Sequence, residues 1–365
     1  MISYHAPLGA RRPPTRRPAV VAMARTAGIA GVVLALGSAA VPSASAATVT
    51  SAGDAAAQPA AAARSGHAAA RSAAWAVLPT PNPLASQGQL IAVSCTSATA
   101  CIAVGSRQDR TGAGVTLAES WNGTAWSVLK TPNPPGATES SLAGVSCTSA
   151  TACTAVGYYR MPGSFRPSSL AEAWNGTSWS IQPTPHQSTA DHVLNAVSCT
   201  SASACTAVGL VGYQTLAERW NGTSWSNQPT PHPEHGPDML LGVSCTSATA
   251  CVAVGSAYDG TIGEVWDGTS WTIQPTPGPQ TVVPFPSASV SCTSATACTA
   301  VWASRFRTVA GGWNGTSWAP QVTATPAGST VHTLPGVSCV PGGPCIAVGN
   351  YQTHTGQFTL AETRS

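Results

Sequence analysis

Cysteine is the residue type in this sequence with the clearest chemical pattern. The chain has 12 cysteines, and they form six Cys-x5-Cys pairs: Cys95/Cys101, Cys147/Cys153, Cys199/Cys205, Cys245/Cys251, Cys292/Cys298 and Cys339/Cys345. If each pair spans a β-hairpin, its two residues face each other at about 5.5 Å or less, which suits a disulfide bond. Zinc binding is the alternative, but zinc ligands are usually about two to four residues apart, and no histidine pairs accompany these cysteines. The pattern therefore predicts six disulfides, which form in an oxidising compartment.

Glutamate also recurs at a fixed position of a repeated phrase. Its five copies are Glu119, Glu172, Glu218, Glu264 and Glu362, with Gly311 in place of the copy before the last. Carboxylates repeated around a ring could form a catalytic or ion-binding site. A buried carboxylate also needs a hydrogen bond from an indole or a backbone amide, and that structural role is the simpler interpretation. The missing copy would break a functional ring but only weaken one structural interface, so we expect a structural role.

Other catalytic motifs are sparse. His232 and His235 flank Pro-Glu, but proline favours an extended backbone there and no third ligand is evident, so we predict no metal site. The sequence contains no Gly-x-Ser-x-Gly motif and no phosphate-binding loop. We therefore expect no cofactor, and we favour a non-enzymatic function over an enzyme.

The N-terminus has the composition of an export signal. Five arginines precede an uncharged run at residues 26–41, and small residues follow up to Ala46. We predict a signal peptide at residues 1–46, exported by the general or the twin-arginine route, and an Ala-rich linker at residues 47–72. The uncharged run is shorter than the roughly 20 apolar residues of a membrane span, so we expect no stable span after cleavage.

Charged side chains are scarce. The 365 residues include 16 Lys+Arg and 13 Asp+Glu, a charged fraction of 8%. The predicted cleavage removes five arginines and no acid, which leaves 11 basic and 13 acidic side chains. The mature chain lacks the basic surface on which binding to a phosphate backbone depends, so we expect no nucleic-acid partner.

A repeat with spacings of 46 to 52 residues organises the rest of the chain. The phrase Val-Ser-Cys-x5-Cys recurs six times, and Trp-Asn-Gly-Thr-x-Trp begins at Trp121, Trp174, Trp220 and Trp313, with Asp267 replacing asparagine in one further copy. These phrases predict four strands per unit, the last two joined by a two-residue Asn-Gly turn. Four strands in roughly 47 residues are typical of a β-propeller blade.

The Asn-Gly turn sets the predicted register of the last two strands. With a two-residue turn after Trp121, that indole would pair with Thr124, and Glu119 would pair with Trp126. Because side chains alternate along a strand, the glutamate and both indoles share a bulky face, and the small residues between them share the other. Each bulky face could then pack on the small face of a neighbouring blade.

The two ends of the chain complement each other. The sixth unit stops at residues 360–365, before a fourth strand, and residues 75–83 read like the fourth strand at 126–134. One split blade and five whole ones would close a ring and remove the free edges that promote aggregation. The sequence therefore predicts an all-β fold at residues 73–365. It is a six-bladed β-propeller with four strands per blade, whose last blade is closed by an N-terminal strand (3+1).

These repeats resemble the kelch and galactose-oxidase-like propellers over about residues 73–364. The likeness lies in an aromatic residue before the last turn, a Trp after it, and a glycine at the end of the second strand. These glycines are Gly105, Gly157, Gly209, Gly255 and Gly349. The chain has one glycine where kelch has two, Trp where kelch often has Tyr, and a cysteine pair that kelch lacks. It also resembles repeat proteins secreted by actinobacteria, which mostly have no assigned activity, and residues 266–271 are similar to the Asp-box hairpin of sialidases.

Sequence variation between the repeats is concentrated in two sets of connections, which in a propeller emerge on one face. The turns within the first and last hairpins are nearly identical, whereas the other connections differ in length and chemistry. Functional residues tend to lie on such loops. The candidate binding residues are Tyr158, Tyr159, Arg160, Phe165, Arg166, His232, His235, Trp302, Arg305, Phe306, Arg307 and Tyr351. Trp302 stands where other units have glycine, and we expect it to reach toward the central channel.

Aromatic and arginine side chains are favoured at recognition surfaces. We therefore predict a secreted, monomeric, non-catalytic binding module that recognises an extracellular glycan or protein through these loops. Two alternatives stay open. One is a secreted hydrolase or lyase with its site at the same mouth, and the other is a structural protein of the cell wall or matrix, in which the repeats are the function.

Overall fold

The structure is a computed structural model that describes residues 79–81, 88–185, 190–232, 236–278, 287–304, 307–354 and 356–364. The predicted signal peptide (1–46), the linker (47–72) and most of the predicted N-terminal strand (73–83) lie outside these ranges. Within the described part, no helix is long and apolar enough to cross a membrane.

The described residues form 23 β-strands and no helix, which confirms the predicted all-β fold. The strands are β1 (Gly88–Ser97), β2 (Ala100–Gln108), β3 (Gly114–Trp121), β4 (Trp126–Leu129), β5 (Glu139–Ser149), β6 (Ala152–Arg160), β7 (Ser168–Trp174), β8 (Trp179–Gln182), β9 (His192–Ser201), β10 (Ala204–Val211), β11 (Gln214–Trp220), β12 (Trp225–Gln228), β13 (Met239–Ser247), β14 (Ala250–Ala257), β15 (Gly260–Trp266), β16 (Trp271–Ile273), β17 (Ser287–Ser294), β18 (Ala297–Ala303), β19 (Thr308–Trp313), β20 (Trp318–Gln321), β21 (Val331–Cys339), β22 (Cys345–Thr353) and β23 (Gly356–Arg364).

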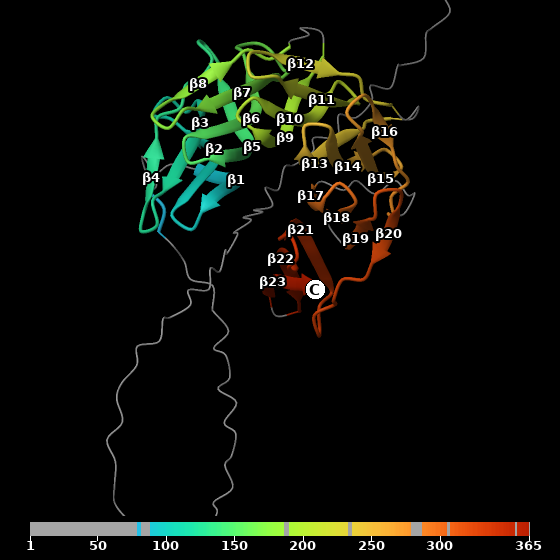
Figure 1. Cartoon of the computed structure of the whole chain (residues 1–365). Helices are drawn as coiled ribbons and strands as arrows, with labels where there is room; N and C mark the ends of the chain where they lie inside the picture. Colours follow the sequence, from blue (N-terminus) through green and yellow to red (C-terminus); the bar gives the residue numbers. More distant parts are fainter. Residues whose placement is uncertain are drawn as a thin grey trace, which may run out of the picture.

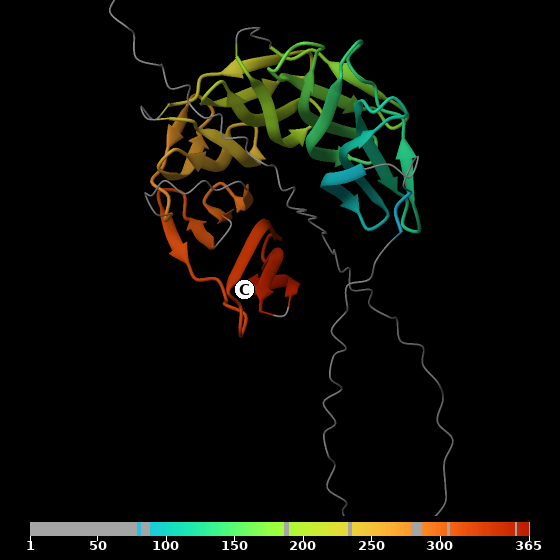
Figure 2. The same cartoon turned by 180° about the vertical axis from the view of Figure 1, so that it is seen from behind.

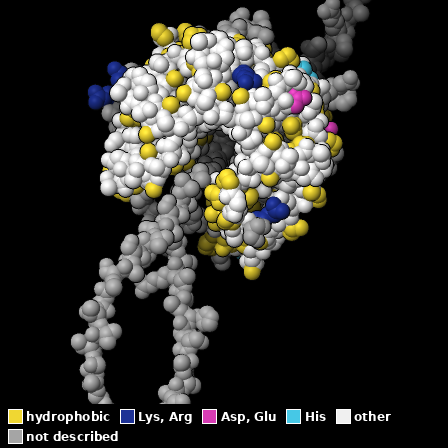
Figure 3. Space-filling view, viewed as in Figure 1, with side chains coloured by type: hydrophobic (Ala, Val, Ile, Leu, Met, Phe, Trp, Pro, Cys, Tyr) yellow, Lys and Arg dark blue, Asp and Glu magenta, His cyan; other side chains and the backbone are white. Residues whose placement is uncertain are grey.

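The strands pair in chain order into repeated antiparallel sheets (Figure 1). We number them sheet 1 (β1–β4), sheet 2 (β5–β8), sheet 3 (β9–β12), sheet 4 (β13–β16), sheet 5 (β17–β20) and the three-stranded sheet 6 (β21–β23). One parallel pair, Gly114 with Glu139, links sheets 1 and 2. Figures 1 and 2 show the sheets in an arc, with each first strand on its inner side, and Figure 3 shows a central hollow. This is the blade architecture of a β-propeller.

All six predicted disulfides are present. They are Cys95–Cys101, Cys147–Cys153, Cys199–Cys205, Cys245–Cys251, Cys292–Cys298 and Cys339–Cys345. Each joins two cysteines that face each other across the first hairpin of a sheet, as Cys95 and Cys101 do between β1 and β2. No cysteine is left free, so the zinc alternative does not apply to these residues. Six disulfides in one chain indicate an oxidising compartment.

The second cysteine of four disulfides is buried between sheets, so these residues belong to the core and not to an accessible site. The four are Cys153, Cys205, Cys251 and Cys298, which are 2–5% exposed. Cys251 of sheet 4 packs in one cluster with Val208 of sheet 3, and its Sγ lies 3.7 Å from the Thr206 hydroxyl oxygen. Cys298 of sheet 5 packs in the same way with Val252 of sheet 4. The disulfides therefore contribute to the packing between sheets as well as joining two strands of one sheet.

The predicted register of the last two strands is wrong. Trp121 pairs directly with Trp126, and Glu119 pairs with Val128, so the turn between the indoles has four residues rather than two. The paired indoles have ring centroids 5.6–5.8 Å apart in all five copies. The glutamate and the two indoles still share one face, so the bulky face is retained.

The asparagine side chain explains the longer turn. Asn122 Oδ1 accepts hydrogen bonds from the N–H and the hydroxyl of Thr124 and from the Ala125 N–H, at 2.8–2.9 Å. Gly123 has a φ of 95°, which favours glycine. Asp267 makes the same three bonds in sheet 4, and they lower the pKa of its carboxyl to about 2, chiefly through the following threonine hydroxyl. These side-chain bonds compete with the tighter turn that Asn-Gly predicts.

Neighbouring sheets pack bulky face on small face, as predicted. Trp179 of sheet 2 joins one buried cluster with Ala118 of sheet 1, and Trp225 of sheet 3 joins another with Ala171 of sheet 2. The same arrangement recurs between sheets 3 and 4 and between sheets 4 and 5. The core of the protein is thus a series of similar layers between sheets.

A ladder of serine hydroxyls joins the innermost strands. Ser94 Oγ accepts a hydrogen bond from the Cys147 N–H of the next sheet at 3.0 Å. The equivalent bond recurs at the four following junctions at 2.9–3.0 Å. These bonds link sheets 1 to 6 in order, so the serine of each Val-Ser-Cys phrase has a structural role.

Three of the repeated glutamates are buried between sheets and do not make the predicted hydrogen bonds, whereas Glu362 is half-buried and its Oε2 accepts the predicted backbone bond from the Ala324 N–H at 2.9 Å. The side chains of Glu172, Glu218 and Glu264 are 0% exposed, and none of their carboxyl oxygens has a hydrogen-bond partner among the described residues. Burial raises the pKa of each carboxyl to about 8, so these groups are mostly neutral acids at pH 7. The Thr116 hydroxyl lies near Glu172 and offsets part of this increase without reaching hydrogen-bond geometry.

Candidate recognition face

Two sets of loops meet at one edge of the sheets. The connections between second and third strands, and those between successive sheets, leave the same strand ends because neighbouring strands are antiparallel. The near-identical turns lie at the opposite edge, which we call the turn edge. We call the first edge the variable rim, which in the described part comprises residues 109–113, 130–138, 161–167, 183–185, 190–191, 212–213, 229–232, 236–238, 258–259, 274–278, 304, 307, 322–330 and 354, with the strand ends beside them.

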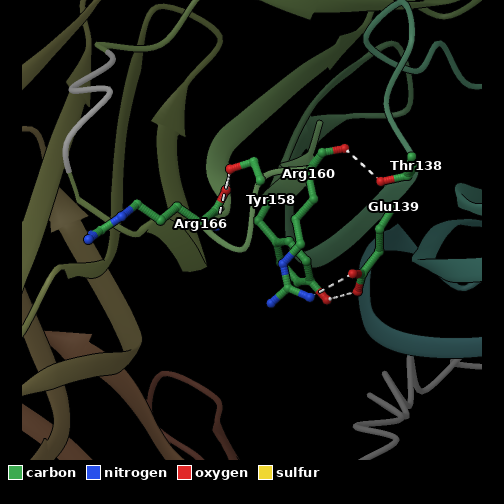
Figure 4. A network of polar contacts seen from close by, with 6 residues as sticks. Thr138, Glu139, Tyr158, Arg160 and Arg166 are labelled. Carbon is green, nitrogen blue, oxygen red and sulfur yellow. Dashed lines mark hydrogen bonds and ion pairs between the residues drawn. The ribbon is translucent and has the colours of Figure 1, made fainter. Parts of the chain in front are cut away.

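A hydrogen-bonded network lies on the variable rim at the end of sheet 2 (Figure 4). The Tyr158 hydroxyl donates to Glu139 Oε1 at 2.7 Å, and Arg160 Nη1 donates to Glu139 Oε2 at 2.8 Å. The guanidinium carbon of Arg160 also lies 5.6 Å from the centroid of the Tyr158 ring. The Thr138 N–H donates to the Arg160 carbonyl oxygen at 2.9 Å. Both oxygens of the Glu139 carboxylate are therefore engaged.

The register of β5 and β6 creates this network. Glu139 pairs directly with Arg160, and Ser141 pairs with Tyr158, so the three networked side chains project from one face. Tyr159 alternates to the other face, where it is partly buried against the core between sheets 1 and 2. Of these three adjacent predicted residues, the structure brings two together and places the third in the packing.

A cavity of about 260 Å³ lies beside the network. Its lining residues are Gly88, Gln89, Ser106, Arg107, Gln108, Gly114, Glu139, Ser140 and Ser141. None of the described residues that line it has an aliphatic or aromatic side chain. Pockets for drug-sized ligands usually exceed about 300 Å³ and are mainly apolar, so this cavity suits one small polar group.

Other predicted binding residues are spread along the variable rim. Phe165 is 96% exposed at the tip of the β6–β7 loop. Its neighbour Arg166 is exposed, and Arg166 Nη1 lies 3.9 Å from a carboxylate oxygen of Asp191. His232 and Arg307 are also exposed, on separate loops. These side chains are accessible, but they do not form one cluster.

Apart from Trp302, one of the remaining predicted binding residues lies in a strand and three lie outside the described part of the chain. Tyr351 of β22 stacks on Phe358 of β23, with ring centroids 5.3 Å apart. His235, Arg305 and Phe306 lie outside the described residues. In the described part, no group of three or more His, Cys, Asp or Glu side chains could hold a metal ion. The absence of a metal at His232 and His235 stays a prediction.

Trp302 does not reach an open channel, and this prediction is wrong. Its side chain is 0% exposed and packs edge-on against Trp318, with ring centroids 5.5 Å apart. The equivalent residue in sheet 1 is Gly105, where a Cβ atom would clash with the Gln89 carbonyl group. The first strand of sheet 1 has a register shift at this point and that of sheet 5 does not, so sheet 5 has room for an indole.

The chain was compared with protein-family models, curated proteins and solved structures. No protein-family model and no curated protein matches the chain. Among solved structures, the chain is similar to one described as the structure of U3-55K, with 13% identity, a TM-score of 0.48, and coverage of 71% of this chain and 73% of the other. It is similar to YCF48 from Cyanidioschyzon merolae, with 12% identity, a TM-score of 0.46, and coverage of 77% and 86%.

A third similar structure is YCF48 bound to D1 peptide, with 10% identity, a TM-score of 0.40, and coverage of 79% of this chain and 98% of the other. At 10–13% identity, these similarities assign no role to any residue of this chain. The kelch type and the likeness to proteins secreted by actinobacteria therefore stay predictions.

Sequence reasoning missed the polar residues beside the predicted ones. Arg107 follows Gly105 at the same distance as Tyr159 follows Gly157, so aligning the first two units on their glycines would have found it. Glu139 could also have been noticed in the sequence, because it is a glutamate that lies outside the repeated glutamate position. The Cys147–Cys153 hairpin then sets the register that places Glu139 opposite Arg160.

Proposed function

We propose that this chain is a secreted, non-catalytic binding protein that recognises an extracellular glycan or protein through the variable rim. The observation that carries the proposal is the contrast between the two edges of the sheets. The turn edge repeats one structure, whereas the variable rim holds the unrepeated aromatic and charged side chains and the Glu139 network. A rigid scaffold with varied loops is typical of recognition proteins. Six disulfides and the predicted signal peptide support export.

We include a closed ring of six sheets in this proposal, because the ends of the arc carry complementary faces. Ile346 on the small face of sheet 6 is 43% exposed, whereas the equivalent Ile102 of sheet 1 is 5% exposed beneath sheet 2. At the other end, Trp126 is partly exposed, whereas the equivalent Trp179 is buried. Packing sheet 1 on sheet 6 would repeat the contact made at the other junctions.

The serine ladder has matching atoms at the same two ends. At each junction described above, a serine of one sheet accepts a bond from a cysteine N–H of the next. Across the junction of sheets 6 and 1, the same bond would join Ser338 Oγ to the Cys95 N–H. Closure therefore needs no interaction that the other junctions lack.

Residues 73–83 would supply the fourth strand of sheet 6. Trp225 Nε1 of sheet 3 donates to Gln182 Oε1 of sheet 2 at 2.9 Å, and the equivalent bond joins sheets 4 and 3 at 3.1 Å. Gln321 holds the equivalent position in sheet 5, where its side-chain oxygen also accepts from the Gly312 N–H at 3.2 Å and from Arg364 Nη1 at 2.7 Å. Trp75 begins the phrase that matches the other fourth strands, so it would be the donor to Gln321.

The binding proposal is tested with two variants of the mature protein, residues 47–365. The rim variant replaces exposed side chains of the variable rim by serine, at Phe165, Arg166, His232 and Arg307. The turn-edge variant replaces exposed residues of the opposite edge by serine, at Ala150, Thr151, Ala202 and Thr249. Binding is measured on a glycan array and on the purified cell envelope of the source organism.

We expect the rim variant to lose at least about tenfold in affinity, because truncating a few contact side chains removes most of a binding energy. The turn-edge variant should bind like the wild type. Wild-type binding to neither probe, or equal binding by the rim variant, would contradict the proposal. Loss of binding only in the turn-edge variant would move the site to the other edge.

A further inference from the structure

We infer that the cavity between sheets 1 and 2 binds an acidic sugar residue, with Arg107 as the contact for its carboxylate. The inference rests on the proposed function and narrows the ligand to an acidic glycan. It depends on three features of the cavity, each taken over the described residues: an unpaired cation in its wall, acids that are already engaged, and a lining without apolar side chains.

Arg107 supplies the unpaired cation. It projects from the end of β2 and lines the cavity. The ion pairs of the described residues join Arg160 to Glu139 and Arg166 to Asp191, and neither includes Arg107. Its Nη1 atom is buried and has no hydrogen-bond partner in the described part of the chain. Buried donors, and charged ones above all, normally have a partner, so this guanidinium is suited to an incoming anion.

The nearby acids do not neutralise Arg107. Glu139 lines the same cavity, but Tyr158 and Arg160 engage its two oxygens. Asp109 Oδ1 accepts three hydrogen bonds from the β2–β3 turn, at 2.7–3.1 Å. The pKa of Asp109 is lowered mainly by its hydrogen bonds to Thr111, and the charge of Arg107 has only a small part in this. A ligand carboxylate can therefore pair with Arg107, and guanidinium pairs well with a planar carboxylate.

The rest of the lining favours a sugar over a peptide side chain. Ser140 is 1% exposed, and its Oγ has no hydrogen-bond partner in the described part, while Ser106, Ser141 and Gln89 add further polar groups to the wall. A sugar ring carries hydroxyls on several sides and can pair with such groups. An acidic peptide side chain would bring a methylene stem and leave most of them unpaired, at a cost for each buried group.

The test uses isothermal titration calorimetry on the mature protein with three probes: glucuronic acid, glucose and acetate. Glucose lacks the carboxylate and acetate lacks the ring, so both should bind at least about tenfold more weakly than glucuronic acid. R107Q should weaken glucuronic acid binding by at least about tenfold. R107K keeps the charge but loses the planar fork, so it should bind with intermediate affinity.

Arg110 provides the matched control, because it is an exposed arginine on the loop that follows β2 and does not line the cavity. R110Q should bind glucuronic acid within about twofold of the wild type. Thermal unfolding of each variant separates lost binding from lost folding, and R107K, which retains the charge, keeps the test decisive if R107Q unfolds.

Several results would overturn the inference. They are wild-type affinity in R107Q, equal affinity for glucose, or no measurable binding of glucuronic acid. If glucuronic acid does not bind but the rim variant still loses binding to a glycan or a protein, the inference is wrong and the proposed function is retained. If the rim variant also binds like the wild type, both fall.

Discussion

Replacing Trp75 by alanine is expected to lower the free energy of unfolding of the mature protein by about 3 to 5 kcal/mol. This is the usual range for truncating a large buried aromatic side chain. In a closed ring, Trp75 would lie in the fourth strand of sheet 6 and donate to Gln321. Deleting the linker, residues 47–72, is the control and should change the stability by less than about 0.5 kcal/mol. Denaturant unfolding curves measure both.

A double-mutant cycle locates the contact. If Trp75 donates to Gln321, the effects of W75A and Q321L should not add, because either change alone removes the same hydrogen bond. Additive effects would place the indole elsewhere. Equal stability of the wild type and W75A would contradict closure of the ring through residues 73–83.

Raising the pH from about 4.5 to about 8 is expected to destabilise the protein. Glu172, Glu218 and Glu264 have a pKa of about 8 in the folded state, against an ordinary value of 4.5. Within this window the folded state holds protons that the unfolded chain has released, so the free energy of unfolding falls as pH rises. Below about pH 4.5 and above about pH 8, these groups do not make the free energy of unfolding depend on pH. The fall should be on the order of 1 to 4 kcal/mol per pH unit for the three groups together.

The triple variant E172Q/E218Q/E264Q tests this cause. Glutamine has nearly the same shape and cannot ionise, so the variant should lose the slope and be more stable than the wild type at pH 7.5. The exposed acid Asp259 provides a control, and D259N should keep the wild-type slope. Denaturant unfolding at pH 4.5, 6 and 8 is the measurement. A wild type that is equally stable at pH 5 and pH 8 would show that these carboxyls ionise without cost.

The sequence predicts the architecture well where covalent spacing or repetition constrains it. Cys95 and Cys101 can face each other across a short hairpin, and six copies of the pattern set the strand order. The burial of Cys251 and Cys298 was not predictable in the same way, because it depends on the neighbouring sheet. The register after Trp121 was harder still, because the side chain that follows it caps a longer turn, and such geometry is not visible in a dipeptide motif.

The candidate site was less predictable, because it depends on contacts between sheets. Exposed residues such as Phe165 stand out as unrepeated aromatics, and the structure leaves Phe165 accessible. Arg107 and Glu139 are 32 residues apart and meet only where sheets 1 and 2 adjoin. Trp302 is the opposite case. It is also an unrepeated aromatic residue, but the first strand of sheet 5 lacks the register shift that sheet 1 has at this point. The indole fills the space that this leaves and belongs to the core.

Hydrogen exchange of the mature protein, alone and with a bound glycan, tests the recognition face most directly. We predict slower exchange of backbone amides in residues 107–114 and 158–167 of the variable rim when the glycan binds. Residues 97–100 and 122–125 of the turn edge should exchange at unchanged rates. Slower exchange confined to the turn edge, with the variable rim unaffected, would contradict a recognition role for the rim.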